Sequence, residues 1–162
     1  MDEYDIKILN IVQRDSRRST EKIADEVGLS PSAVQRRLKR LRETGIIESE
    51  VAIVSPEAIG RKVMAIVEVV MQRERPLSAP QNEFKRLMLA SPEVMHCYHV
   101  TGDVDFIVIV SAEDMEDYEA LTRKLFIDNP AVRGYRTHIV MKRVKSGTAI
   151  PMRVNRDSPD YP

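Results

Sequence analysis

The sequence contains a single cysteine, Cys97, among 162 residues. One cysteine excludes an internal disulfide and cannot form a metal cluster by itself, so we expect a reducing compartment and no cofactor. No apolar stretch approaches the roughly 20 residues that a membrane-spanning helix needs, and residues 106–110 are among the longer ones. Residues 1–5 are acidic and lack the apolar segment of a secretory signal. We therefore expect a cytoplasmic protein without a membrane span.

Net charge is also lacking, because 25 Lys and Arg are matched by 25 Asp and Glu. Such a chain is not drawn as a whole to polyanions, so any affinity for DNA must be local. The signatures of common enzyme classes are missing as well. There is no Gly-rich phosphate loop, no cluster of metal ligands at a recognisable spacing and no nucleophile elbow. The sequence favours a binding protein of one or two small domains.

Helical patterns dominate the first part of the chain. Ile6, Leu9 and Val12 recur at helical spacing, which predicts a first helix over residues 2–13. A second helix is predicted over residues 19–28, with the side-chain oxygen of Ser19 or Thr20 to cap its start and Gly28 to end it.

The third helix has start and stop signals at both ends. Ser30 can serve as N-cap, Pro31 occupies the first helical position, and a glycine follows the end, so we predict a helix over residues 30–44. The β-branched residues that follow predict a short wing or connecting strand within residues 46–54. Three helices and a wing are typical of a winged helix-turn-helix domain, which we place at residues 1–54.

The third helix has one buried face and one cationic face. Val34, Leu38 and Leu41 fall on one narrow arc and are expected to pack against the preceding helices. No acid lies between Pro31 and Arg42, and five Lys or Arg residues give this stretch a local charge of +5. Short polar groups followed by cations suit insertion into the major groove of DNA. The outward residues are Ser32, Gln35, Arg36, Lys39 and Arg40.

These outward residues divide into base readers and phosphate contacts. Gln can bond an adenine edge and Arg a guanine edge with two hydrogen bonds, so we assign Ser32, Gln35 and Arg36 to reading. Lys39 and Arg40 are assigned mainly to phosphates, which add affinity without sequence preference. Further contacts with the DNA backbone are expected from Arg17, Arg18 and Thr20. The alternative is that the cationic face is merely solvated.

After a linker at residues 55–61 the pattern changes to alternating strands and helices. Strands are predicted over residues 62–71, 94–100, 106–110 and 132–141, and helices over residues 80–90 and 115–126. This order is that of a ferredoxin-like βαββαβ domain, so the fold class is α+β. We place this effector and oligomerisation domain at residues 62–145. Residues 146–162, rich in Pro, Arg and Asp, are predicted to form an extended C-terminal tail.

The first and third predicted strands are almost continuously apolar, as expected of central strands buried on both faces. The other two strands are mixed, as edge strands would be. Two helices can cover only one face of such a sheet. We therefore expect the uncovered face to meet a second copy of the chain in a homodimer.

Several segments together resemble the leucine-responsive/asparagine-responsive regulator (Lrp/AsnC) family, over residues 5–145. The matching segments are DIKIL at 5–9, IADEVGLS at 23–30, VQRRLKRL at 34–41, GII at 45–47 and TGDVDF at 101–106. The last segment is similar to a hairpin of the family's effector domain. The resemblance implies a sequence-specific, DNA-binding transcription regulator that senses an amino acid or related metabolite. It also implies dimers that assemble into tetramers, octamers or larger oligomers.

In that family amino acids bind between dimers near this hairpin turn. The resemblance therefore implies an effector site at Thr101, Gly102, Asp103 and Asp105, with Tyr98 and Thr137 as weaker neighbours. A glycine permits close approach of a ligand, exposed N–H groups could receive a carboxylate, and an Asp could accept an α-ammonium group. The alternative is that the Gly-Asp pair only forms a turn and that Asp105 only holds backbone amides.

Two other functions remain open at this point. A subunit of a tetrapyrrole decarboxylase resembles the same two-domain architecture, with His96, His99 and His138 as candidate catalytic residues. Histidines on strands are more often surface or core residues, and a capped cationic helix would be superfluous in such an enzyme. The second alternative is a small-molecule-binding oligomer that does not bind DNA.

Overall fold

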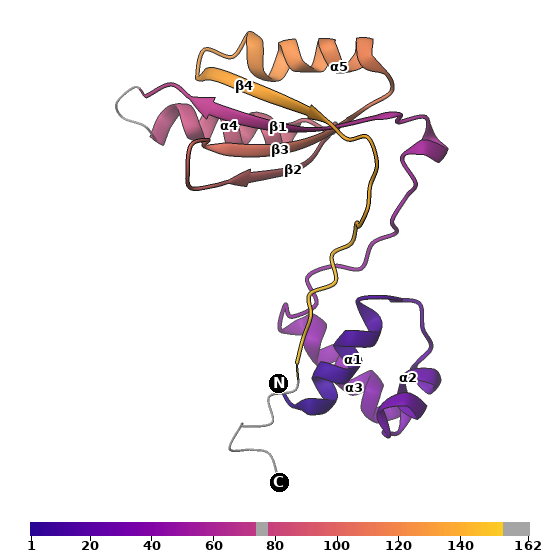
Figure 1. Ribbon diagram of the computed structural model, residues 1–162. Helices are drawn as coiled ribbons and strands as arrows, with labels where there is room; N and C mark the ends of the chain where they lie inside the picture. Colours follow the sequence, from indigo (N-terminus) through magenta and orange to yellow (C-terminus); the bar gives the residue numbers. More distant parts are fainter. Residues whose placement is uncertain (74–77, 154–162) are drawn as a thin grey trace. The chain divides into compact units, whose positions relative to one another are not determined.

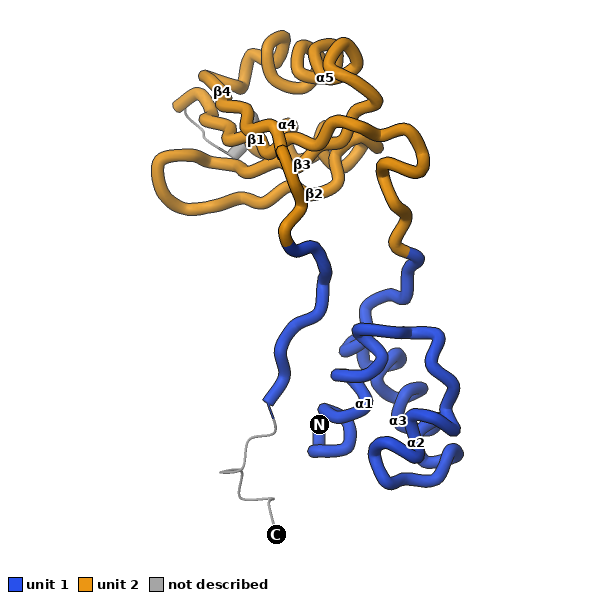
Figure 2. The backbone as a smooth tube through the Cα atoms, turned by 45° about the vertical axis from the view of Figure 1, so that its right-hand side comes forward, with its two compact units in different colours: residues 1–52, 145–162 blue, residues 53–144 orange. Residues whose placement is uncertain are grey.

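The computed structural model describes residues 1–73 and 78–153. The chain divides into two compact units (Figure 2), one formed by residues 1–52 together with the segment from residue 145 onward, and one by residues 53–144. The first unit is helical, and the second combines a sheet with helices (Figure 1).

The first unit is built from α1 (Glu3–Val12), α2 (Thr20–Val27) and α3 (Pro31–Glu43). This confirms the three predicted helices to within one or two residues at each end. Their apolar faces form one small core, because each helix contributes a single stripe of hydrophobic side chains. The buried residues of this core are Ile8, Ile23, Ala24, Val27, Val34 and Leu38.

Local hydrogen bonds fix the turn between α2 and α3. Gly28 ends α2 with a left-handed φ of 72°, a conformation that costs glycine little. Two residues later the hydroxyl of Ser30 accepts a hydrogen bond from the amide of Ala33 and caps the start of α3. These two signals lie within one short turn, so local chemistry sets where α3 begins.

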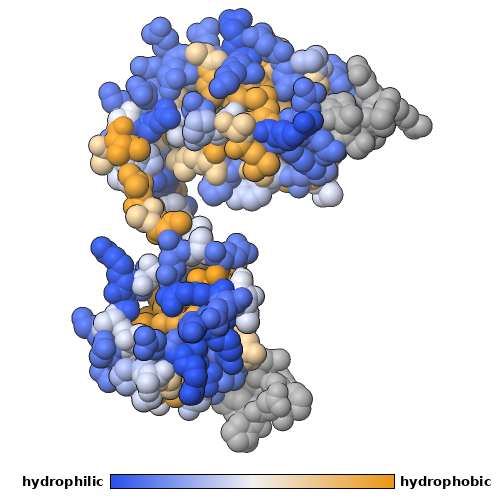
Figure 3. Space-filling model, turned by 180° about the vertical axis from the view of Figure 1, so that it is seen from behind, coloured by the Kyte–Doolittle hydropathy of each residue, from blue (hydrophilic) through white to orange (hydrophobic). Residues whose placement is uncertain are grey.

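No strand lies between α3 and the sheet in the described residues 44–62, so the predicted wing or connecting strand is wrong. The amide of Ile47 donates to the carbonyl of Leu41, and Ile47 packs on the core of the first unit. Downstream, Val51 is 72% exposed and Ile53 is 83% exposed, and Figure 3 shows hydrophobic side chains along this connecting segment. β-branched residues favour a strand, but a strand also needs a partner for its backbone groups.

Within residues 53–73 and 78–144, the second unit contains a short 3-10 turn (Glu57–Ile59), four strands and two helices that cover the sheet (Figure 1). In chain order these are β1 (Val63–Met71), α4 (Ser78–Ala90), β2 (Val94–His99), β3 (Phe106–Ala112), α5 (Met115–Thr122) and β4 (Val132–Ile139). A π-helical turn (Arg123–Ile127) extends α5. The sheet order is β2-β3-β1-β4 with antiparallel neighbours. The ferredoxin-like topology and the central position of the first and third strands are thus confirmed.

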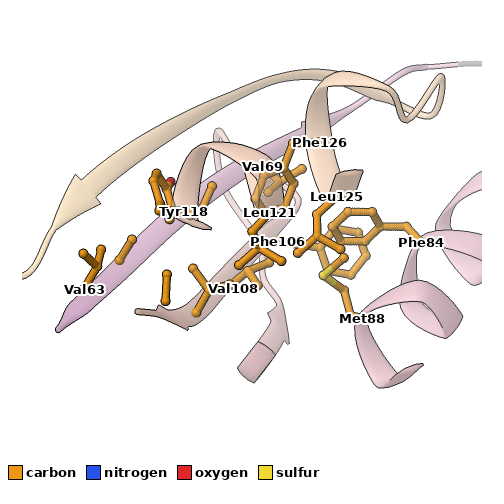
Figure 4. Packing of buried hydrophobic residues seen from close by; sticks show 14 of the residues in the cluster. Val63, Val69, Phe84, Met88, Phe106, Val108, Tyr118, Leu121, Leu125 and Phe126 are labelled. Atoms are coloured by element: carbon orange, nitrogen blue, oxygen red, sulfur yellow. The ribbon is translucent and has the colours of Figure 1, made fainter. Parts of the chain in front are cut away.

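The core of this unit lies between the sheet and the two helices (Figure 4). Alternate residues of β3, beginning with Phe106 and Val108, are buried against side chains such as Phe84 of α4 and Leu121 of α5. Both helices therefore pack on the same face. The strand residues that alternate with the buried ones point to the opposite face of the sheet. The apolar ones on β1 and β3 are Met64, Ile66, Val70, Ile107 and Ile109, which remain partly accessible.

Candidate DNA-binding helix and effector groove

The exposed face of α3 carries the residues that the sequence assigns to DNA. Val34, Leu38 and Leu41 are buried, at 5% exposure or less. The opposite side of the helix is accessible, because the apolar stripe is the side of α3 that packs on the core of this unit. The exposed residues on it include Ser32, Gln35, Arg36, Lys39 and Arg40.

Asp5 links the start of α1 to α3 and is only 1% exposed. Its Oδ1 accepts a hydrogen bond from Nη1 of Arg37 at 2.8 Å, and its Oδ2 accepts one from Nη2 of Arg40 at 2.6 Å. The backbone amide of Asp2 donates to the same Oδ2 at 2.9 Å. A buried carboxylate with three such partners is fully compensated, so Asp5 stabilises the position of α3.

Asp2 completes this arrangement by capping α1. Its carboxylate accepts hydrogen bonds from the amide of Asp5 at 2.9 Å and from Nη1 of Arg37 at 2.7 Å. Partial burial opposes the charge of Asp2, but these two hydrogen bonds outweigh it and lower the pKa of Asp2. Burial likewise opposes the charge of Arg37, and its bonds to Asp2 and Asp5 raise the pKa of that guanidinium.

This network was not predicted from the sequence, although the spacing of Asp2 and Asp5 is a capping-box signal. Its consequence is that the local charge of α3 is lower than the helix alone indicates. Arg40, assigned to phosphates, is bonded to Asp5 and is 53% exposed. Lys39 lies 3.8 Å from Glu43, and Arg42 lies 2.9 Å from Glu50.

Gln35 and Arg36 differ from these residues. Among residues 1–73 and 78–153, neither side chain takes part in a hydrogen bond or ion pair, and both are exposed. The donors of both side chains are therefore available to bases. Near the start of α2, Arg18 pairs with Glu26 at 2.5 Å and the hydroxyl of Thr20 contacts Glu21 at 3.4 Å. Arg17 is exposed.

A groove of about 540 Å³ lies beside the loop that joins β2 to β3. Its lining combines one acid of this loop with acidic and basic groups of β1 and β4, a mixture that suits a zwitterion. The lining residues are Glu68, Val70, Asp103, Val104, Arg133, Gly134, Tyr135 and Arg136. A β-bulge between Val70 and Met71 shifts the register of β1 against β4 and affects the placement of Arg133. Neither arginine was predicted from the sequence; for Arg133 the reason is that periodicity does not reveal a bulge.

The structure places only Asp103 of the predicted effector residues in this groove. Asp105 instead accepts a hydrogen bond from the amide of Met71 at 2.7 Å, and its own amide donates to Val69 at 2.9 Å. It thus holds the loop against β1. Thr101 and Gly102 are exposed in the bend before Asp103, and Gly102 has a φ of 119°.

Tyr98 and Thr137 are not brought together. Tyr98 is on the uncovered face of β2, where its hydroxyl lies 3.3 Å from Nδ1 of His96. Thr137 is on the helix-covered face, 2.6 Å from the hydroxyl of Tyr118. Neither residue lines the groove.

The three histidines do not form a common site either. His99 stacks on Phe106, with ring centroids 4.8 Å apart. His96 and His138 belong to the opposite edge strands of the sheet, and Nε2 of His138 lies 3.4 Å from Glu68. Within the described ranges no three His, Cys, Asp or Glu side chains are grouped to hold a metal ion. None of the helices in those ranges is long and apolar enough to cross a membrane.

Comparison with known proteins agrees with both halves of this architecture. Residues 1–42 match the AsnC-type helix-turn-helix domain, and residues 64–150 match the Lrp/AsnC ligand binding domain. An uncharacterised HTH-type transcriptional regulator of Sinorhizobium fredii is 49% identical, covering 95% of this chain and 90% of that protein. The leucine-responsive regulatory protein of Haemophilus influenzae is 34% identical, covering 90% of this chain and 86% of that protein.

Solved structures give the same result. A transcriptional regulator of Neisseria meningitidis, in complex with L-Met, superposes with a TM-score of 0.87 at 28% identity, covering 93% of this chain and 96% of that one. An AsnC family transcriptional regulator from Agrobacterium tumefaciens has a TM-score of 0.86 at 30% identity, covering 93% and 97%.

A helix-turn-helix followed by a ligand-binding α+β domain defines a transcription regulator. The chain belongs to the Lrp/AsnC family. Members of this family are transcription regulators and not enzymes, so the alternative of a tetrapyrrole decarboxylase subunit is wrong.

Proposed function

We propose that the chain recognises specific double-stranded DNA as a homodimer or an assembly of dimers, and that an amino acid or related small metabolite regulates this binding. The observation that carries DNA recognition is that Gln35 and Arg36 are exposed on α3, a helix held in place by the hydrogen bonds of its arginines to Asp5. A bidentate contact from each would contribute about 1–3 kcal/mol of discrimination between bases. Because the proposed target is DNA, we place the protein in the cytoplasm.

The proposed dimer is supported by the uncovered face of the sheet. Met64, Ile66, Ile107 and Ile109 form an apolar surface there, opposite the face on which α4 and α5 pack. A second copy would bury this surface and place two α3 helices in successive major grooves of a partly palindromic site. Further association into tetramers, octamers or larger oligomers is proposed from the resemblance to the family.

The proposed effector site is the groove beside the loop that joins β2 to β3. Asp103 can accept the α-ammonium group of an amino acid, and Arg133 or Arg136 can donate to its α-carboxylate. The volume of about 540 Å³ is within the usual range for small-molecule sites. The L-Met complex of the Neisseria regulator supports the choice of ligand class.

Replacing Gln35 and Arg36 by Ala tests DNA recognition. We expect specific binding in a gel-shift assay to be abolished, while the oligomer measured by light scattering is unchanged, because neither residue is buried. Arg123→Ala is the matched control, since it removes an exposed cation from α5's extension. Wild-type affinity should fall steeply with salt as phosphates are neutralised. Wild-type binding that ignores salt would contradict DNA recognition.

Thermal-shift screening of all amino acids tests the effector. A ligand at 100 times its dissociation constant should add about 2.7 kcal/mol to the free energy of unfolding. Asp103→Ala should abolish the shift, whereas Glu83→Ala, which removes an exposed acid of α4, should retain it. If no amino acid raises the melting temperature, the effector proposal is refuted, whereas the proposal of DNA recognition is not affected.

A further inference from the structure

Two amide side chains, Asn10 of α1 and Gln13 at its C-cap, hold a segment at residues 150–152. Nε2 of Gln13 donates to the carbonyl of Ile150 at 2.9 Å, and the amide of Ile150 donates back to Oε1 of Gln13 at 2.8 Å. Three residues earlier in α1, Nδ2 of Asn10 donates to the carbonyl of Met152 at 3.2 Å. Nε2 of Gln13 also donates to Oδ1 of Asn10 at 3.1 Å, which orients the two amides together.

These contacts recognise the backbone of the segment more than its side chains. A carboxamide has both a donor and an acceptor, so Gln13 pairs with a peptide group much as a neighbouring strand would. The side chain of Ile150 is largely accessible, at 70% exposure, and Met152 is partly buried. Pro151, between the two contacted residues, removes no hydrogen bond here and favours an extended backbone.

The segment belongs to the helical unit although it follows β4 in sequence. Residues 53–62 already join the helical unit to the sheet. The segment after β4 returns from the sheet to α1. Two segments of the chain thus connect the DNA-binding unit to the effector unit. The first is the covalent linker after α3, and the second is the segment after β4, whose attachment to the helical unit depends on the amides of Asn10 and Gln13.

We propose that Asn10 and Gln13 form a peptide-docking face at the C-terminal end of α1 that binds residues 149–152 of the same chain, and that this docking is a second tether between the DNA-binding and effector domains. A second tether restricts the space that each recognition helix samples. It raises the effective concentration of one recognition helix at its half-site once the other is bound. This consequence for DNA rests on the proposed function, whereas the docking itself does not.

Amide hydrogen exchange, measured by NMR on the full chain, tests the docking. The Ile150 amide should be protected in the wild type and should exchange several-fold faster in Gln13→Ala, because its acceptor is gone. Arg14→Ala, which changes the next and exposed residue, is the matched control and should leave this rate unchanged. An Ile150 amide that exchanges at the unprotected rate in the wild type, or equally in all three proteins, would overturn the docking.

DNA titrations test the tether. A chain ending at residue 147 should bind a two-half-site DNA roughly tenfold or more weakly than wild type and a single half-site equally well, since α3 is intact. A chain ending at residue 153 retains the docked segment and should match the wild type. Gln13→Ala should repeat the first result in a full-length chain. Equal two-site affinity in the 147-residue chain and in Gln13→Ala would refute the tether. Failure of the wild type to bind any DNA would instead refute the proposed function, and the exchange rates would still decide the docking.

Discussion

The substitution Asp5→Asn probes the link between α1 and α3 without changing side-chain volume. Both carboxylate oxygens accept hydrogen bonds from N–H groups, so an NH₂ group at either position faces a donor. Charge-assisted hydrogen bonds contribute about 1.5–3 kcal/mol each. The pair with Arg40 contributes less because that guanidinium is 53% exposed, whereas Arg37 is 21% exposed and loses a buried partner. We expect a loss of about 2–4 kcal/mol in the free energy of unfolding of the helical unit.

Urea unfolding followed by circular dichroism measures this loss. Calorimetry should show the transition of the helical unit about 10 °C or more lower, since 1 kcal/mol corresponds to about 4–8 °C in a domain of this size. The matched control is Asp25→Asn on the exposed side of α2, which should stay within about 0.5 kcal/mol of wild type. If Asp5→Asn also stays within that limit, the carboxylate does not anchor α3 and the reasoning is refuted.

Three further outcomes are expected. Asp2→Ala should weaken the acid dependence of the free energy of unfolding. The pKa of Asp2 in the folded protein lies below its usual 3.8. The stabilisation by its carboxylate is therefore complete above pH 3.8 and disappears as the pH falls through the folded pKa. Unfolding curves of variant and wild type should therefore converge in acid, and a constant difference would contradict this. Gly28→Ala should cost about 1 kcal/mol in urea unfolding, because φ is 72° although no atom lies within 4 Å of the added methyl. Phe106→Ala should cost about 3–5 kcal/mol by calorimetry, since the ring is 1% exposed and lies 4.9 Å from that of Phe84; a cost below about 1 kcal/mol would show that the core collapses around the gap.

Local chemistry made the helices of the first unit predictable from the sequence alone. Ser30 and Gly28 act within one turn of the chain, so their effects on α3 and α2 do not depend on distant residues. The division of α3 into buried and exposed faces follows from a period of 3.6 residues in the same way. The strand order was predictable because the two central strands are apolar on both faces.

Long-range pairing determined the features that the sequence did not reveal. The segment 46–54 has the composition of a strand but finds no strand partner in the described part of the chain. Groups far apart in sequence meet only after folding, as Asp5 does with Arg40, Asp105 with Met71 and Gln13 with Ile150. The sequence alone therefore determined the helices of the first unit, the strand order of the second and the division of α3 into a buried and an exposed face. Only the tertiary structure decided which cations of that face are already paired, which polar groups line the groove and which side chains contact Ile150 and Met152, because each depends on contacts that no local pattern encodes.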